Sequence, residues 1–340
     1  MKGAAALSPI LTVFVIAAIA SAVLLAVLIR LLPSHFLAAG INERSNHTQP
    51  ARQLGGLAIV PVVLALLWLF GARMGLDQRF LVTASIGALI LWITGMLDDR
   101  YHLPESIRII AQLTAACLCV YGLGPDFRLL PDFFPVLLER GLLVLALVYF
   151  INLTNFMDGL DLMVVSGLGI PLAFLAGFAA FGLAGMASGS IAAAIAGGLC
   201  GFALFNRPKA TVFLGDSGSL PLGLLCGLAF FMVARDMRIA TGLILPLFFI
   251  ADATTTLIKR LLEGDNIFAA HSKHAYQVAK RAGWSVWQVV LTVAALNVIL
   301  GICALAASNV YSALTTSGRR SRMRESSPAG RSPIVGAASS

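Results

Sequence analysis

The chain has 340 residues, of which 59% are hydrophobic and only 12% are charged. A water-soluble domain carries about 25% charged residues, so this composition excludes an ordinary soluble protein and predicts one that lies in a bilayer. The net charge of +8 does not indicate nucleic-acid binding, because the basic residues lie in short loops between apolar segments, as in the cytoplasmic loops of membrane proteins.

The first apolar segment, residues 8–32, is too long for the apolar part of a signal peptide and predicts a retained membrane span. Further apolar runs follow at residues 53–70, 80–97, 107–123, 136–151, 162–183, 187–205, 218–234, 239–258 and 286–308. They predict an all-α polytopic membrane protein with about ten transmembrane helices. The uncharged stretch 162–205 is too long for one span, and its Gly- and Ser-rich residues 185–190 are the predicted turn.

The five cysteines all lie inside apolar runs, with no spacing typical of a zinc site or a disulfide framework. We interpret them as packing residues.

The loops between these runs are of two kinds that alternate along the chain. The plain loops are residues 71–79, 124–135, 184–186 and 235–238, and the polar loops are 33–52, 98–106, 152–161, 206–217 and 259–285. Two spans separate successive polar loops, so all five are expected on one face. That face carries more Lys and Arg than the other, which predicts that it is cytoplasmic and forms an active-site cleft there.

Residues 1–312 are expected to form a single catalytic membrane domain, and the Ser- and Arg-rich residues 313–340 a disordered tail. With ten spans this basic tail would lie outside, against the charge rule. Either a disordered tail is tolerated there, or the number of spans differs by one after the last motif.

Asp98 and Asp99 end the third span, where two adjacent carboxylates are costly. Neighbouring residues on a helix do not share a face, so one carboxylate can meet a metal while the other pairs with Arg100 or Arg108. The simpler interpretation is a solvated helix end.

The fifth span is followed by a segment that contains Asn152, Asn155, Asp158 and Asp161. If this segment is helical, the last three are spaced three residues apart and successive pairs are neighbours. Their oxygen atoms suit a hard cation such as Mg²⁺, and Gly159 permits close backbone approach. A polar turn is the alternative.

The eighth apolar run opens with Phe213, Gly215, Asp216 and Ser217, a pattern typical of a helix N-terminus. Free N–H groups at such an end attract phosphate, and Asp216 could hold a metal against that phosphate. A simple helix cap is the alternative.

Asp252 lies inside the ninth run, where a carboxylate is a functional candidate or a structural hydrogen-bonding group. His271, Lys273 and His274 begin a basic stretch that suits an anion better than zinc, with an interfacial helix as the alternative. The first polar loop carries Arg44, His47 and Arg52, which can bind a nucleotide or phosphate or be ordinary basic loop residues.

Together these motifs collect carboxylates, a phosphate-binding helix end and basic loops on one face. That combination is typical of metal-assisted phosphoryl transfer.

Four motifs, in their order along the chain, resemble those of the polyprenyl-phosphate N-acetylhexosamine-1-phosphate transferases. They are Asp98-Asp99, Asn152-x-x-Asn155-x-x-Asp158-Gly-x-Asp161, Phe213-x-Gly215-Asp216-x-Gly218-Ser219 and His271-x-x-His274. The likeness runs from about residue 42 to residue 281. The short first loop and the histidine segment are most similar to the enzymes that initiate O-antigen synthesis.

The resemblance implies transfer of a sugar 1-phosphate from a UDP-sugar to undecaprenyl or another polyprenyl phosphate, with release of UMP. It implies a fold of ten or eleven spans in a bacterial inner membrane, with Mg²⁺ (or Mn²⁺) as the cofactor. Membrane lipid surrounds such a protein, no nucleic acid takes part, and a homodimer is an open alternative to a monomer.

The resemblance also implies roles for individual residues. It assigns Mg²⁺ to Asp216, with Asp158 and Asn155 beside it, and Asp98 and Asp99 to the metal or the lipid phosphate. Substrate would meet the remaining candidates, which are Arg44, His47, Arg52, Asn152, Asp161, Lys209, Phe213, Ser217, Asp252, Lys273 and the catalytic His271 and His274.

The chain departs from the family pattern at a few positions near these motifs. Leu162 stands where a second glycine is usual, which affects the expected uracil pocket. Leu214 replaces a common methionine, and Lys209 and Thr211 replace a proline and a basic residue. No carboxylate is lost.

A secondary transporter is the alternative from a different functional class, because Asp252 and the Gly-rich spans would suit one. Transporters place their polar residues near the membrane midplane, whereas these residues cluster toward one face. The sugar remains undetermined between N-acetylglucosamine and a 6-deoxy relative such as N-acetylfucosamine.

Overall fold

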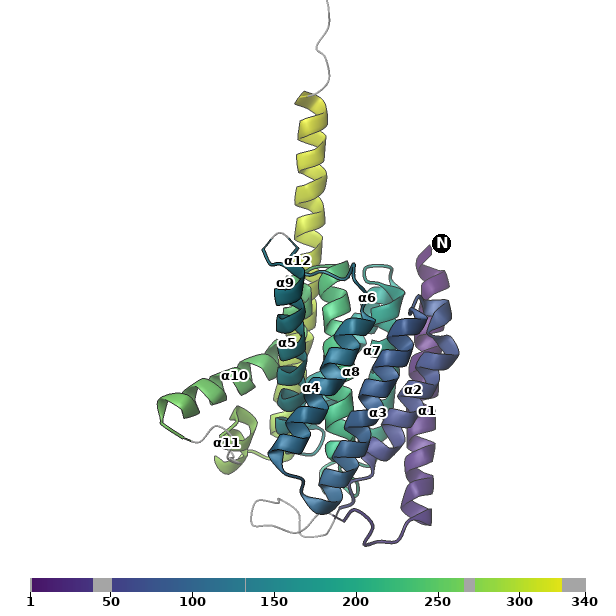
Figure 1. The fold of residues 1–340 in the computed structure, drawn as a ribbon, viewed down its shortest axis with the longest axis vertical. Helices are drawn as coiled ribbons and strands as arrows, with labels where there is room; N and C mark the ends of the chain where they lie inside the picture. The colour runs from purple at the N-terminus through teal and green to yellow at the C-terminus, as the bar shows by residue number, and fades with distance from the viewer. Residues whose placement is uncertain (1, 39–50, 132, 266–272, 326–340) are drawn as a thin grey trace, which may run out of the picture.

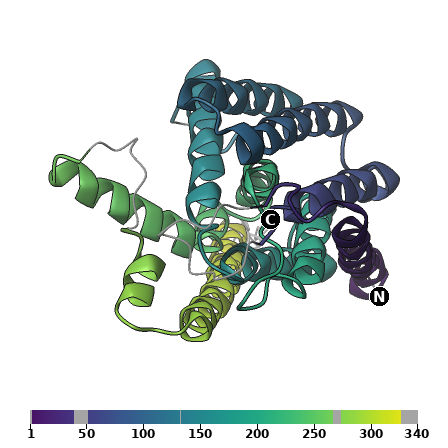
Figure 2. The ribbon, with the colours of Figure 1, turned by 90° about the horizontal axis from the view of Figure 1, so that it is seen from below.

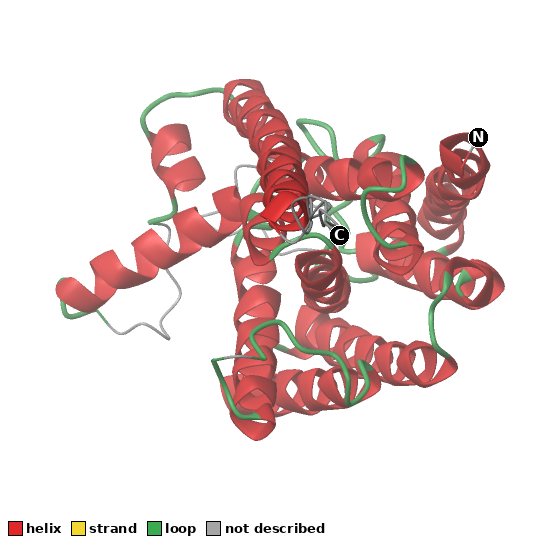
Figure 3. Cartoon of the chain, turned by 90° about the horizontal axis from the view of Figure 1, so that it is seen from above, coloured by secondary structure: helices red, strands yellow, loops and turns green. Residues whose placement is uncertain are grey.

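A computed structural model describes residues 2–38, 51–131, 133–265 and 273–325 (Figure 1). These residues form helices and loops, with no β-strand among them (Figure 3). The predicted all-helical class is therefore confirmed for the described part of the chain.

The helices follow the predicted apolar runs in order. They are α1 (Lys2–Leu31), α2 (Gly55–Phe70), the short η1 (Ala72–Met74), α3 (Gln78–Tyr101), α4 (Glu105–Gly122), α5 (Val136–Phe156), the π-helical turn η2 (Val165–Gly169), α6 (Ile170–Ala180), α7 (Met186–Ala203), α8 (Asp216–Asp236), α9 (Ile239–Ile244), α10 (Leu247–Leu262), α11 (Ala275–Arg281) and α12 (Val286–Glu325). The predicted boundary of the tail at residue 312 falls within α12, and the predicted disorder beyond it stays a prediction.

Six of the described helices are long and apolar enough to cross a membrane: α1, α3, α5, α7, α8 and α12. Two shorter apolar helices, α2 and the continuous helix 165–180, accompany them. The protein is therefore a polytopic membrane protein, and the figure of about ten spans stays a prediction.

Two details of the predicted spans are wrong. The run 239–258 is not one helix, because α9 ends before Pro246 and α10 begins after it, and a proline inside a helix removes a backbone hydrogen bond. The turn between α6 and α7 occupies residues 181–185 rather than 185–190. Gly182, with φ of 75°, follows the end of α6. Gly189 lies inside α7, where a Cβ would stand 2.1 Å from the Cβ of Ala179, so it serves close packing of α7 on α6 and not a turn.

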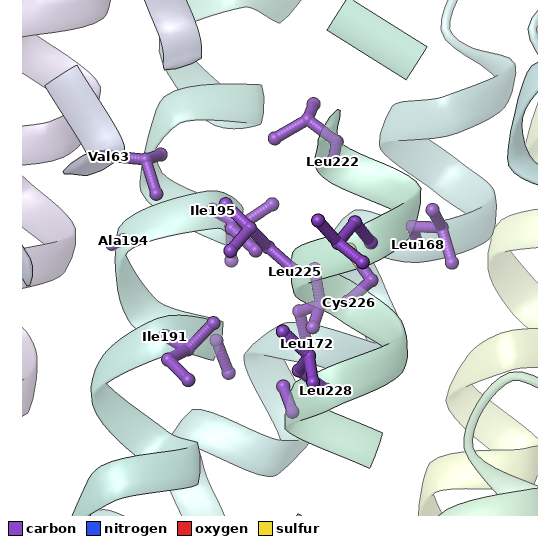
Figure 4. Packing of buried hydrophobic residues seen from close by; sticks show 14 of the residues in the cluster. Val63, Leu168, Leu172, Ile191, Ala194, Ile195, Leu222, Leu225, Cys226 and Leu228 are labelled. Carbon is purple, nitrogen blue, oxygen red and sulfur yellow. The ribbon is translucent and has the colours of Figure 1, made fainter. Parts of the chain in front are cut away.

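Helix α8 lies at the centre of the bundle, where 94% of its most apolar window is buried, against 33% for α5 and α12. Its Leu222, Leu225 and Leu228 pack with side chains from α6 and α7 such as Leu172 and Ile195 (Figure 4). The outer helices expose their apolar side chains, as expected for surfaces in contact with lipid. All five cysteines are free thiols in apolar helices; Cys119 and Cys226 are buried, as predicted for packing residues, whereas Cys117, Cys200 and Cys303 are exposed.

The helices run alternately up and down, so the last residues of α3 and α5 lie at the same end of the bundle as the first residues of α8 (Figure 1). Isolated β-bridges join Arg52 to Ala38 and to Val212, which connects the first polar loop to the loop before α8. Helices α10 and α11 project sideways from the bundle (Figures 1 and 2).

Candidate active site

The carboxylate of Asp99 holds the first turn of α8. Its two oxygens accept hydrogen bonds from the backbone N–H groups of Asp216 (2.8 Å) and Ser217 (3.1 Å). Gly215 precedes the helix with φ of 73°, a conformation that favours glycine, and a Cβ there would lie 2.7 Å from Asp99. The hydrogen bonds to Asp99, at the end of α3, therefore fix the position of the first turn of α8.

This arrangement corrects the predicted phosphate site at the N-terminus of α8. The first N–H groups of a helix lack partners within the helix and need an acceptor. Here Asp99 already supplies that acceptor for Asp216 and Ser217, and Gly218 and Ser219 donate to the carbonyl of Gly215. These four N–H groups are therefore not free for a phosphate.

Asp216 itself is fixed by α5. The side-chain amide of Asn155 donates to Asp216 Oδ1 (2.7 Å) and to the hydroxyl of Ser219 (2.9 Å). The predicted proximity of Asn155 and Asp216, which are distant in sequence, is thus present in the structure. Ser219 completes this contact. It belongs to the motif of the sequence analysis but was given no role there, because a serine in the first turn is common in any helix.

Asp98 faces α4. Its oxygens accept from the backbone N–H of Leu103 (2.6 Å) and from Arg108 (3.2 Å). The same guanidinium lies 4.0 Å from Asp216 Oδ2. Of the two predicted partners for the Asp98-Asp99 pair, the structure selects Arg108.

Close packing of α3 against α8 depends on Gly95. A Cβ at this position would stand 2.3 Å from the backbone carbon of Asp216 and 2.5 Å from the nitrogen of Ser217. Only glycine leaves room for this approach. One helical turn before Asp99, α3 therefore lies directly against the residue at the centre of the site.

Asp158 lies in a turn and not on a helix, because α5 ends at Phe156. Of the two interpretations of this segment, a helix or a polar turn, the structure selects the turn for Asp158. Burial, together with the negative charges of Asp216 and Asp99, raises the pKa of Asp158 well above its usual range. A cation at this point would oppose that effect, since it favours the ionised carboxylate.

The turn after Asp158 packs against the loop before α8. Asp161 is buried and accepts from the backbone N–H of Ala210 (3.4 Å), while Asn206 accepts from the N–H of Leu162 (2.7 Å) and donates to the carbonyl of Val212 (2.9 Å). Asn206 was not predicted, and its only signal in the sequence is an amide at the end of a long uncharged run.

Two residues in this region have left-handed backbones, namely Leu162 with φ of 59° and Lys209 with φ of 66°. Residue 162 is the position where the resemblance predicted a second glycine.

Asp252 anchors α11 to α10. Its Oδ1 accepts from the backbone N–H of Ala275 (2.8 Å) and lies 3.7 Å from His274 Nδ1. Both side chains are buried, so the structure supports the structural alternative for Asp252. Lys273 pairs with Glu263 (2.7 Å) and Asp265 (2.6 Å).

The remaining predicted residues have structural partners or lie outside the described part. Arg52 donates to the carbonyls of Ile29 (2.8 Å) and Leu32 (2.9 Å) and so caps α1. Asn152 bonds Gln112 across α4 and α5, and Phe213 exchanges backbone bonds with Arg52 and Gly55. Arg44, His47 and His271 fall on residues that the structure does not describe.

The side chains near Asp216 fit Mg²⁺ in their chemistry. Among the described residues, no three acidic, histidine or cysteine side chains form a ready-made metal site. Mg²⁺ does not require one, because it binds proteins through one or two carboxylates and completes its shell with water and substrate phosphates. Asp216 and Asp158, with the amide of Asn155 beside them, would supply such a partial shell.

Comparison with known proteins identifies similar chains. A protein of Bacillus subtilis, named a probable undecaprenyl-phosphate N-acetylglucosaminyl 1-phosphate transferase, is 27% identical over 279 residues, which are 78% of this chain and 75% of that protein. A decaprenyl-phosphate N-acetylglucosaminephosphotransferase of Mycobacterium leprae is 28% identical over 290 residues, 74% of this chain and 72% of the relative.

A third relative covers less of each chain. A phospho-N-acetylmuramoyl-pentapeptide-transferase of Listeria welshimeri is 33% identical over 165 residues, 46% of this chain and 49% of its own. The family model described as glycosyl transferase family 4 matches residues 81–234. Over that interval the chain is similar to glycosyl transferase family 4. The matched interval runs from α3 to α8 and includes Asp98, Asp99, Asn155, Asp158 and Asp216.

Proposed function

We propose that this protein transfers an N-acetylhexosamine 1-phosphate from a UDP-sugar to undecaprenyl phosphate, releases UMP and so starts a cell-surface polysaccharide such as O-antigen. The observation that carries the proposal is the convergence of Asp98, Asp99, Asn155, Asp158 and Asp216 at one end of a membrane bundle. The activities named for its relatives, which act on polyprenyl phosphates, support the same reaction class.

The proposed reaction exchanges one phosphoanhydride for another. An oxygen of the lipid phosphate attacks the sugar-bound phosphorus of the UDP-sugar, a new P–O bond forms, and the bond to the UMP oxygen breaks. UMP leaves with the electron pair of that bond. Because similar bonds are made and broken, the equilibrium is expected to be close to neutral and the reaction reversible.

The residues at the site would act mainly through position and charge. Mg²⁺, when bound, would neutralise negative charge on the diphosphate. Asp216 and Asp158 would hold it, Asn155 would orient Asp216, and Arg108 would balance Asp98. A phosphate monoester has its second pKa near about 6, so the lipid phosphate needs no strong base at neutral pH, and Asp98 would orient rather than remove a proton.

The proposed location is the bacterial inner membrane, with the site on the cytoplasmic side where UDP-sugars are made. N-acetylglucosamine is the first candidate for the transferred sugar, because the names of the Bacillus and Mycobacterium relatives contain it. N-acetylfucosamine is the second candidate, from the likeness of the first loop and histidine segment to O-antigen initiators.

A reconstitution experiment tests this function. Purified protein in detergent is mixed with undecaprenyl phosphate, Mg²⁺ and a panel of UDP-sugars, and UMP and the lipid product are measured. We expect UMP only when lipid, sugar nucleotide and Mg²⁺ are all present, and loss of at least about 100-fold in rate for Asp216→Asn, since electrostatic groups of this kind are worth that much.

Three other outcomes would change the proposal. UMP release without lipid would indicate a covalent aspartyl-phosphate intermediate. Turnover unaffected by EDTA would remove Mg²⁺ from the scheme. Flux of a sugar nucleotide into proteoliposomes without turnover would favour the transporter.

A further inference from the structure

Beyond the proposed catalytic residues, one side chain links the turn of Asp158 to a distant part of the chain. Tyr276, on α11, is 3% exposed, and its hydroxyl donates to the carbonyl of Phe156 (3.1 Å), the last residue of α5. Phe156 is two residues before Asp158. The hydroxyl therefore lies against the backbone that leads into the turn.

The same hydroxyl fills the space beside Gly159. A Cβ on Gly159 would stand 2.2 Å from the Tyr276 hydroxyl but 3.3 Å from the ring carbon that carries it. The backbone of Gly159 does not adopt a positive φ, so an alanine is compatible with its conformation. The Tyr276 hydroxyl is therefore the atom that an added Cβ at this position would approach most closely.

The position of Tyr276 is in turn fixed by contacts at the start of α11. Its ring stacks on His274 with centroids 6.0 Å apart, and the backbone at Ala275 is bonded to Asp252 of α10 (2.8 Å). A buried connection thus runs from α10 through the first turn of α11 to the end of α5. Helices α10 and α11 otherwise project from the bundle (Figure 2). The bonds between Asp252 and Ala275 and between Tyr276 and Phe156 therefore link these two helices to the turn of Asp158.

We propose that Tyr276 is a positioning residue: its hydroxyl, held by the Asp252-anchored start of α11, sets the position of the turn that carries Asp158. The inference rests on the proposed function only for its catalytic consequence, because the contact itself is a property of the fold. A small displacement of a binding group in such a site is enough to slow a reaction while substrate still binds.

The first test removes only the hydroxyl. Tyr276→Phe, measured as full-length protein in detergent, is expected to lower kcat about 10-fold, because Asp158 loses its fixed position, while KM for the UDP-sugar changes less than about threefold. The midpoint of thermal unfolding should fall by only a few degrees, since the ring and its stacking are kept. A Tyr276→Phe protein with unchanged kcat would overturn the proposal.

The second test uses the space beside Gly159. Gly159→Ala should lower both kcat and the unfolding midpoint in the wild-type background, because its Cβ meets the hydroxyl. In the Tyr276→Phe background the same substitution should cost little, since the nearest ring atom is then 3.3 Å away. If Gly159→Ala is equally harmful in both backgrounds, the proposed contact does not set the turn.

Two other glycines serve as matched controls. Gly141→Ala on α5 has no neighbour within 4 Å and should be tolerated in both backgrounds. Gly167→Ala would meet Phe249 at 1.9 Å and should be equally harmful in both, which excludes a general rescue by Tyr276→Phe. If wild-type protein shows no transferase activity, the proposed function fails, and the unfolding midpoints still decide the role of Tyr276.

Discussion

At the scale of single residues, Leu162 has a side chain that is unfavourable for its left-handed backbone conformation. Its φ of 59° lies where residues other than glycine cost about 1–2 kcal/mol. Its side chain is half-buried and packs against the core, and its N–H donates to Asn206. The departure from the family's glycine therefore exchanges backbone strain for apolar packing.

The left-handed backbone of Leu162 predicts that glycine is more stabilising than alanine at this position, the reverse of the usual order of these two substitutions. Leu162→Gly and Leu162→Ala both lose the side chain, but only alanine keeps the strain, so the glycine variant should be more stable by about 1 kcal/mol. Leu123 is a matched control, because it is also half-buried against the core and has φ of −61°. There alanine should be at least as stable as glycine. Thermal unfolding in detergent measures both pairs, and the same order at both positions would contradict the argument.

At the scale of helices, Arg140 of α5 fastens the end of α4. Its guanidinium donates to the carbonyl of Val120 (3.0 Å), in the last turn of α4, and to those of Gly124 (2.5 Å) and Phe127 (2.9 Å), in the loop that follows. The last carbonyls of a helix have no partners within it, and a cation also stabilises the negative end of the helix dipole. This contact lies at the end of the bundle opposite Asp216.

Arg140→Met should therefore reduce stability and spare chemistry. We expect a loss of about 2–3 kcal/mol, since several partly buried carbonyls lose a charged donor. Transferase activity well below the unfolding temperature should stay within about twofold of wild type. Arg73→Met is the control, because Arg73 is exposed in a plain loop at the same end of the bundle. It should leave the unfolding midpoint unchanged. A selective fall in kcat for Arg140→Met would show that the two ends of the bundle are coupled.

At the scale of the whole molecule, the site occupies one end of the bundle, and the N-terminus and the last turns of α12 lie at the other (Figure 1). The positive-inside rule predicts that the site end is cytoplasmic. The basic residues after Ser317 would then lie outside, against the same rule. A measurement of sidedness is therefore informative whichever end is inside.

Cysteine labelling makes that measurement. With the five native cysteines replaced, Arg100→Cys and Lys209→Cys at the site end should react with an impermeant reagent only in inverted vesicles. Arg73→Cys and Arg238→Cys at the opposite end should react only in intact cells or right-side-out vesicles. Reaction of any site-end cysteine from the outer side would overturn the proposed cytoplasmic site.

The sequence by itself determined the membrane class, the order of the helices and which residue types gather at one end. Apolar runs and the alternation of plain and polar loops can be read along the chain, so they can be predicted without knowing how the helices pack. The tertiary structure decided what each polar group binds: Asp99 caps α8, Arg52 caps α1, and Asp252 anchors α11. These partners lie 20 or more residues apart in the chain, and a short polar motif reads the same whether its partner is a substrate or another helix. Tyr276 shows the limit most clearly, because only packing brings its hydroxyl to Gly159.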